Sequence, residues 1–374
     1  MIFVYICECL LYIAFSIVIS SFLLTLISEK HKPAIAIPRY LVPFCIVLIP
    51  ILSYAPLHQV AISNAASFKL DYLTMIKSVI LDLQIGQAWT WTVLGCSGLL
   101  IINTVPVFKQ DRHMPKVSFL LTLLLTIWFG YASHAASLST IKGLVVHAGH
   151  FLAVILWLGV LFIVAWFSKP PQHWHAFLNW FSPFAFGCVL MALTAGFTLM
   201  TFTTPQYVNS WVIPYGQMLL LKHISIIPLL WLGFTNGFLY KRKYIAQERL
   251  QPDRQAYDPI PMLRVESFIA IIVLLFTAIM GQQMPPHDLI ETLRTQTPST
   301  LFTSFFDGAY SPDIQLSLQL QMDTILLWLA AVVMLYATFT AFQERKAWPM
   351  LVTCLLFIVF TYLGFMFSLT TIES

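Results

Sequence analysis

Long apolar segments dominate this sequence and leave few folds open to it. Ten stretches of roughly 20 residues carry almost no charge, and about 20 apolar residues are what a helix needs to cross a bilayer. Hydrophobic residues make up 59% of the chain and charged residues 10%, whereas charged residues make up about 25% of soluble domains. Because a segment in lipid must satisfy its own backbone hydrogen bonds, the sequence predicts an all-α, polytopic membrane helix bundle.

The expected spans number about ten and alternate in direction. The first apolar run follows no basic stretch and ends at no small-residue cleavage site, so we expect a retained span rather than a signal peptide. The apolar runs place the spans at residues 3–28, 39–56, 87–108, 116–137, 144–167, 180–202, 215–240, 263–284, 323–343 and 348–370.

The distribution of basic residues gives the chain an orientation. Apart from Lys222, fifteen lysines and arginines lie in or beside one set of alternate loops, and four lie in the other set. Loops rich in Lys and Arg remain in the cytoplasm. We therefore expect the basic loop 241–264 to be cytoplasmic and both termini to be extracytoplasmic.

Two of the outer connections are long. The polar and acidic segment 287–322 is expected to form an extracytoplasmic loop, and within it residues 314–321 alternate between apolar and polar side chains. That alternation predicts a short strand, or else the lead-in to the ninth span. Segment 57–86 predicts an interfacial amphipathic helix, because four apolar side chains share one helical face: Leu73, Ile76, Ile80 and Leu83.

Three histidines lie at the facing ends of the fourth and fifth spans, on the expected outer side: His134, His147 and His150. His147 and His150 are three residues apart and share a helix face. Imidazole binds copper, zinc, iron and nickel, and a histidine at the mouth of a span is costly unless it binds, pairs or reaches water. The trio predicts a metal site, although each histidine alone could equally be an interface residue bonded to a carbonyl or a headgroup.

Further candidate ligands lie near two other spans. Met284 and His287 follow the eighth span in the run MGQQMPPH, and thioether together with imidazole suits Cu(I). His223 is expected near mid-membrane in the seventh span, where polar residues are functional candidates. Packing is the simpler explanation for a single methionine in a membrane helix, so the prediction of a metal site depends mainly on the histidines.

Two other polar groups lie inside apolar runs. Lys222 is an awkward metal ligand because its fixed charge repels a cation, so it could pair with Glu8 or Glu266, bind an anionic group or lose its proton. Cys7 and Cys9 flank Glu8, but residues two apart on a helix point in different directions. The two thiols therefore make a weak candidate for one shared ion.

Several classes of function are disfavoured. The chain has no basic surface interleaved with stacking aromatics, which argues against nucleic acid as a partner. Its six cysteines form neither a disulfide framework nor a paired zinc motif. Hydrolase signatures such as HExxH and GxSxG do not occur in a plausible setting, so we expect no enzyme.

Several short motifs follow one another between residues 130 and 286. They are Ser133-His134-Ala135-Ala136, His150 with Trp157-Leu158-Gly159, Phe181-Ser182-Pro183, Thr194-Ala195-Gly196, Pro214-Tyr215-Gly216 leading into Leu219-Leu220-Leu221-Lys222, Arg264-Val265-Glu266, and Pro285-Pro286. By the order and spacing of these motifs the segment resembles the copper resistance protein D (CopD) family.

The resemblance implies a multi-pass protein of the bacterial plasma (inner) membrane that handles a copper ion and imports it. His134, His150 and Lys222 match family positions, whereas His147 is an addition. Some members carry a fused soluble copper-binding domain of the CopC type, which this N-terminus lacks. A separate extracytoplasmic copper-binding donor protein is therefore an expected partner, besides membrane lipid.

The resemblance also divides the chain. Residues 1–129 are expected to be N-terminal membrane helices with the interfacial segment 57–86, residues 130–286 a CopD-like membrane domain, and residues 323–374 two C-terminal membrane helices. Copper transport is the leading hypothesis. A haem-binding redox protein, with paired histidines on the iron, and an assembly factor that delivers copper to a membrane oxidase remain the alternatives.

Overall fold

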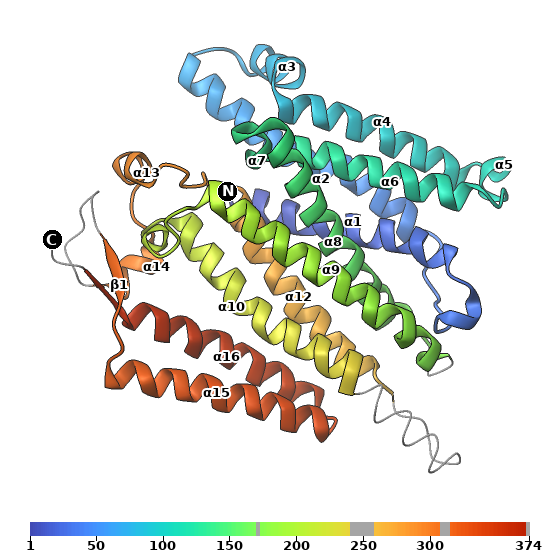
Figure 1. Ribbon diagram of the computed structural model, residues 1–374. Helices are drawn as coiled ribbons and strands as arrows, with labels where there is room; N and C mark the ends of the chain where they lie inside the picture. The colour runs from blue at the N-terminus through green and yellow to red at the C-terminus, as the bar shows by residue number, and fades with distance from the viewer. Residues whose placement is uncertain (170–172, 240–257, 307–314, 372–374) are drawn as a thin grey trace. The chain divides into compact units, whose positions relative to one another are not determined.

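Ten helices in the described part of the chain are long and apolar enough to cross a membrane, which confirms the all-α polytopic bundle. The computed structural model describes residues 1–169, 173–239, 258–306 and 315–371, and Figure 1 shows their helices. The expected basic loop 241–264 therefore lies mostly outside the described residues. The spans are α1 (Ile2–Leu26), α2 (Leu41–Phe68), α4 (Gln84–Thr104), α6 (Met114–Tyr131), α8 (Thr140–Phe167), α9 (Trp174–Thr203), α10 (Pro214–Phe234), α12 (Ile260–Gly281), α15 (Met322–Gln343) and α16 (Ala347–Phe367).

The chain divides into two compact units. Unit 1 comprises residues 1–199 with 248–258, and unit 2 comprises residues 200–247 with 259–374. The shorter elements are η1 (Glu29–His31), α3 (Tyr72–Asp82), α5 (Pro106–Lys109) and α7 (His134–Leu138) in unit 1, and η2 (Asn209–Val212), the π-helical turn η3 (Thr235–Leu239), α13 (Leu289–Thr295), α14 (Thr300–Thr303), β1 (Leu316–Leu318) and β2 (Leu369–Thr371) in unit 2.

In unit 1, α1 packs against α2, α6 and α8. Small residues allow the closest of these approaches, as is usual between membrane helices. A Cβ atom on Gly159 of α8 would lie 2.1 Å from the carbonyl oxygen of Ser16 on α1. The hydroxyl of Ser20 lies 3.4 Å from the carbonyl oxygen of Ile155. Glycine at position 159 therefore sets the spacing between α1 and α8.

In unit 2, α10 packs against α12 and α16, and α15 forms a hairpin with α16. The helices α15 and α16 lie side by side in Figure 1. Tyr362 of α16 donates a hydrogen bond to Oε1 of Gln217 on α10 at 2.6 Å, and Gln217 Nε2 donates to the carbonyl of Trp211 at 2.6 Å. Gln217 is fully buried, so these bonds satisfy a polar group that would otherwise be costly in the core.

Segment 57–86 differs in part from the sequence prediction. α2 continues to Phe68, and Lys69 ends it in the left-handed conformation with φ 54°. The predicted amphipathic helix is present as α3, but the face that it buries is Met75, Ile76 and Val79, while Leu73 is exposed. The extension of α2 supplies the apolar surface, including Leu57 and Ala61, that α3 covers.

The predicted strand within residues 314–321 is present as β1, which pairs antiparallel with β2. The tenth span was expected to reach residue 370, but α16 ends at Phe367 and the next residues form β2. The pairing joins Leu316 to Thr371 and Leu318 to Leu369. This two-stranded sheet ties the start of α15 to the end of α16.

Candidate metal centre

α8 begins earlier than hydropathy predicts, and this sets how far two candidate ligands lie from the first residue of the helix. The expected start was residue 144, but the helix begins at Thr140. At roughly 1.5 Å per residue, His147 lies about 10 Å and His150 about 15 Å along the axis from that start. Both side chains are half-buried. They therefore lie in the second and third turns of α8 rather than at its mouth.

His150 is held by the backbone of α9. Its Nδ1 lies 2.8 Å from the carbonyl oxygen of Ala192, and both residues belong to unit 1. A carbonyl oxygen can only accept, so Nδ1 must carry the proton and donate it. In the neutral ring Nε2 then carries the lone pair, which is the form in which histidine binds a metal.

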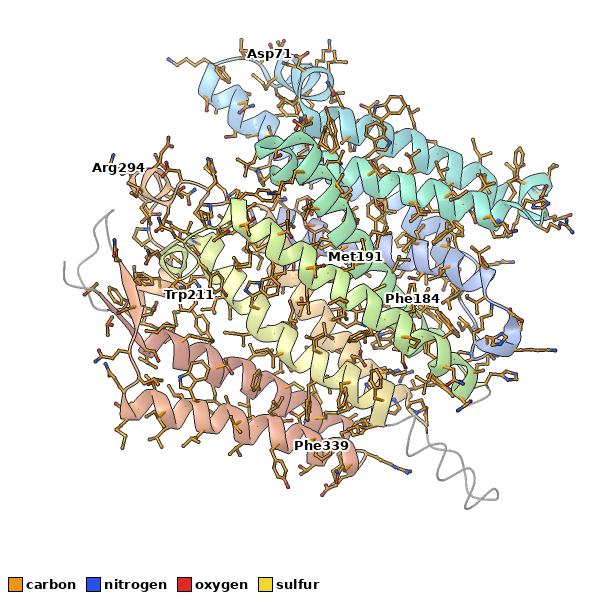
Figure 2. The ribbon with its side chains drawn as sticks, viewed as in Figure 1. Asp71, Phe184, Met191, Trp211, Arg294 and Phe339 are labelled. Atoms are coloured by element: carbon orange, nitrogen blue, oxygen red, sulfur yellow. The ribbon has the colours of Figure 1, made fainter. Side chains whose placement is uncertain are left out.

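Glycines make room for this contact between α8 and α9. A Cβ atom on Gly196 of α9 would lie 3.4 Å from Cε1 of His150. A Cβ atom on Gly149 of α8 would lie 3.1 Å from the terminal methyl carbon of Met191, a residue of α9 labelled in Figure 2. The imidazole of His150 and the thioether of Met191 thus belong to one helix–helix seam.

His147 lies against the aromatic side chains of a different interface. Its ring is 6.0 Å from that of Phe129 on α6, and Phe129 stacks on Phe151 at 4.2 Å. The Nδ1 atom of His147 is buried. Close packing of α6 on α8 creates this environment, because a Cβ atom on Gly130 would lie 2.7 Å from the Cβ of Ala148.

His134 begins the short helix α7. The Ser133 side chain caps that helix by accepting a hydrogen bond from the backbone N–H of Ala136 at 3.2 Å, as N-cap serines do. Gly143 of α8 lies so close that a Cβ there would be 1.8 Å from the carbonyl oxygen of Ala135. Although His134 is partly exposed, desolvation by surrounding protein atoms lowers the pKa of its imidazole, which favours the neutral, metal-binding form.

His223 has a phenol as its neighbour in unit 2. The hydroxyl of Tyr207 lies 2.8 Å from Nδ1 of His223, and burial raises the pKa of Tyr207 well above its usual value. A neutral phenol can donate or accept, so this bond permits either tautomer of His223. The described residues give the adjacent Lys222 no acidic partner, since their salt bridges are Lys32–Glu29 and Lys346–Glu344.

Met284 and His287 lie in the segment that follows α12. Met284 is 58% exposed, and His287 is also exposed, with its Nδ1 3.3 Å from the carbonyl oxygen of Pro285. The two prolines at 285 and 286 are buried and anchor this turn. The segment presents its sulfur and imidazole on the surface of unit 2.

The candidate ligands lie in different environments of the structure. Within the described residues, no three His, Cys, Asp or Glu side chains lie together as a group able to hold a metal ion. His134, His147 and His150 therefore do not form a three-ligand cluster by themselves in this conformation. The six free cysteines are all buried.

Comparison with known protein families matches one segment of this chain. Residues 175–280 match the sequence model of copper resistance protein D, so this segment is similar to a CopD domain. It comprises most of α9 together with α10 and α12, and so includes Ala192, Gly196, Lys222 and His223. The resemblance was expected over residues 130–286, whereas the match is shorter and does not include α7 or α8, which carry His134, His147 and His150.

One relative is a membrane protein of a well-known bacterium. The inner membrane protein YebZ of Escherichia coli strain K12 is 24% identical over 223 residues, which cover 56% of this chain and 72% of YebZ. No solved structure matches the chain. With ten apolar helices in its described residues and these similarities, the chain is a multi-pass inner membrane protein that is similar in sequence to copper resistance protein D.

Two partners of the histidines had no signal in the sequence. Ala192 contributes a backbone carbonyl, which every residue has, and it lies 42 residues from His150 along the chain. Tyr207 lies 16 residues before His223 in a connection between spans. In the sequence, Gly196 appears only as part of the Thr194-Ala195-Gly196 motif. Only the packed helices show that Gly196 leaves space for the imidazole of His150.

Proposed function

We propose that this protein transports copper across the inner membrane, in the direction of import. The observation that carries the proposal is the contact between His150 and the carbonyl of Ala192, because α9, within the segment that is similar to CopD, thereby orients an imidazole for metal binding. Import follows from the expected orientation, in which His134, His147 and His150 face the extracytoplasmic side. A separate copper-binding donor protein would supply the ion there.

The chemistry of the side chains fits Cu(I) better than a hard cation. Imidazole and thioether groups are suitable ligands for Cu(I), and Met191 lies in the same seam as His150. His134 and His147 would add imidazoles at the outer side, while Met284 and His287 would offer an exposed first contact. Because the described residues hold no preformed group of three such ligands, copper binding would draw donors together or take a ligand from the donor protein.

Within unit 2, His223 of α10 would offer the ion a separate binding position. When Nδ1 of His223 donates to the hydroxyl oxygen of Tyr207, Nε2 carries the lone pair for a metal. The neighbouring charge of Lys222 opposes a cation at this point, so copper would be held weakly there. Weak binding suits a transport path, since an ion must also leave each site that it enters.

Copper uptake into proteoliposomes tests the proposal. The purified protein should admit copper, and the double variant His147→Ala plus His150→Ala should reduce the initial rate at least tenfold. Gly187→Ala is a suitable control on α9, because no atom lies within 4 Å of a Cβ placed there. Unchanged uptake in the double variant would refute the histidine site.

Metal analysis and an absorbance spectrum of the same preparation separate transport from the alternatives. Copper without a Soret band supports the proposal, whereas a stoichiometric Soret band would indicate a haem protein. Copper binding without any uptake would indicate an assembly factor. Combined with the uptake assay, these two measurements distinguish the three outcomes in one preparation.

A further inference from the structure

A buried carboxyl group lies in unit 2 where α10 gives way to a π-helical turn. Glu266 of α12 is 4% exposed and Asn236 of η3 is 6% exposed. Asn236 Nδ2 donates a hydrogen bond to Oε2 of Glu266 at 2.7 Å. A Cβ atom on Gly233 would lie 3.4 Å from Oε1, so glycine leaves space beside the second oxygen. π-Helical turns are rare and occur often at functional sites.

Glu266 has no cationic partner among the described residues, whose two salt bridges lie elsewhere. Lys222 was one expected partner, but it precedes Asn236 on the same helix by about 21 Å at roughly 1.5 Å per residue. The carboxyl group is thus bonded to a neutral amide. A buried ionised carboxylate without a counter-charge is costly, so this group is stable with a proton or a cation bound.

The helices around Glu266 offer no other carboxyl group. α10 and α16 pack on α12, and none of α10, η3 and α16 contains Asp or Glu. On α12 itself the other charged residue is Arg264, which is exposed. The remaining titratable side chains on the neighbouring helices are Tyr215, Lys222 and His223 on α10 and Cys354 and Tyr362 on α16.

The ligand chemistry favours a proton over copper at this position. A carboxylate and an amide offer hard oxygen atoms, whereas Cu(I) prefers sulfur and imidazole. We infer that Glu266 is a proton-exchange site that couples proton movement to copper movement, an inference that rests on the proposed transport of copper. In each cycle a carboxylate oxygen takes a proton from hydronium, so that one O–H bond forms on Glu266 as one O–H bond of hydronium breaks, and the reverse step later returns the proton to water. No electron moves in this step.

Proteoliposomes with a pH-sensitive dye inside test the coupling. In the wild type, an imposed pH gradient should change the initial rate of copper uptake several-fold, and a copper gradient should drive proton movement. Glu266→Gln keeps the shape and the acceptor for Asn236 but cannot exchange a proton. It should still admit copper down a concentration gradient while losing both the pH-gradient effect and the copper-driven proton signal.

Matched variants make the result specific. Glu291→Gln applies the same change to an exposed residue of α13 and should behave as the wild type. Glu266→Asp keeps an exchangeable acid and should recover part of the coupling. A Glu266→Gln protein that is folded and still coupled to the pH gradient would overturn the inference, as would one that admits no copper under any gradient.

The experiment also separates this inference from the proposed function. If the wild type admits no copper at all, the transport proposal fails, and the coupling fails with it. If the wild type admits copper at a rate that is insensitive to the pH gradient, transport stands and only the role of Glu266 is refuted.

Discussion

The Nδ1 atom of His150 lies 2.8 Å from the carbonyl oxygen of Ala192. This contact joins a histidine of α8 to the backbone of α9, within the segment that is similar to CopD, and fixes which ring nitrogen holds the proton. The bond of His223 to Tyr207 has a similar length, 2.8 Å, but leaves the tautomer open because a hydroxyl can donate or accept. Of the two, His150 is therefore the better-prepared metal ligand.

Filling the space beside His150 should weaken copper binding. In Gly196→Leu the new side chain would begin 3.4 Å from Cε1 of His150 and push the ring off the Ala192 carbonyl. Loss of such an orienting bond typically costs about 10- to 100-fold in metal affinity. Competition with a Cu(I) chelator measures the effect. Gly187→Leu on the same helix should leave the affinity unchanged, and equal affinities for the two variants would contradict the role of the contact.

The corner between α7 and α8 should not tolerate a methyl group. In Gly143→Ala the added Cβ would lie 1.8 Å from the carbonyl oxygen of Ala135, so the backbone must shift. Overpacking of this kind costs about 1–3 kcal/mol, and thermal unfolding in detergent should show a lower midpoint. Gly98→Ala provides the control, since its Cβ would meet Leu121 at 3.5 Å, an ordinary contact. A midpoint shift as small as in Gly98→Ala would argue against the tight corner.

The buried network of Gln217 should anchor the C-terminal hairpin. Tyr362→Phe removes the hydroxyl that donates to Gln217 Oε1 at 2.6 Å and leaves a buried acceptor without that bond, at a cost of about 1–3 kcal/mol. Tyr336→Phe makes the same change at a side chain that is 68% exposed and should be neutral. Chemical denaturation of both variants measures the difference, and two identical curves would show that the bond does not stabilise unit 2.

The start of α3 should depend on pH. Hydrogen bonds from Thr74 to the Asp71 carboxylate lower the pKa of that group. A lowered folded-state pKa means that the cap stabilises α3 above the unfolded value of about 3.9 and is lost as the pH falls through the folded value. Hydrogen exchange in α3 should therefore accelerate in acid relative to Asp71→Asn, whose amide also caps but does not titrate. Parallel behaviour of the two proteins would exclude this dependence.

The sequence predicts the spans well because each apolar run is long, but it predicts helix ends poorly. Hydropathy reports where lipid begins, whereas α8 continues four residues further, to Thr140, into polar sequence. For the same reason the distance of His147 and His150 from the first residue of the helix was underestimated. The spacing of these two residues was enough to propose them as metal ligands. The sequence could not identify the carbonyl of Ala192 as the partner of His150, because every residue has a backbone carbonyl whatever its type.

The Glu266–Asn236 contact was missed for a related reason. Both residues are visible as polar positions near the ends of two spans, but their approach depends on the π-helical turn at Thr235–Leu239. No residue in that turn is diagnostic of π geometry. Lys222 was considered as a partner of Glu266 because both are charged residues within apolar runs, and only the helical rise shows that Lys222 lies about 21 Å along the helix from Asn236, which contacts Glu266.

The π-helical turn also fixes the rotational register of the end of α10. A π turn contains one more residue than an α turn, and each residue of a regular helix rotates the chain by about 100°. If Thr235 were deleted and the turn became regular helix, the side chains of residues 236–239 would turn by about that angle. Asn236 would then swing away from Glu266. Deletion of Thr235 is thus a larger change than most substitutions, because it redirects several side chains at once.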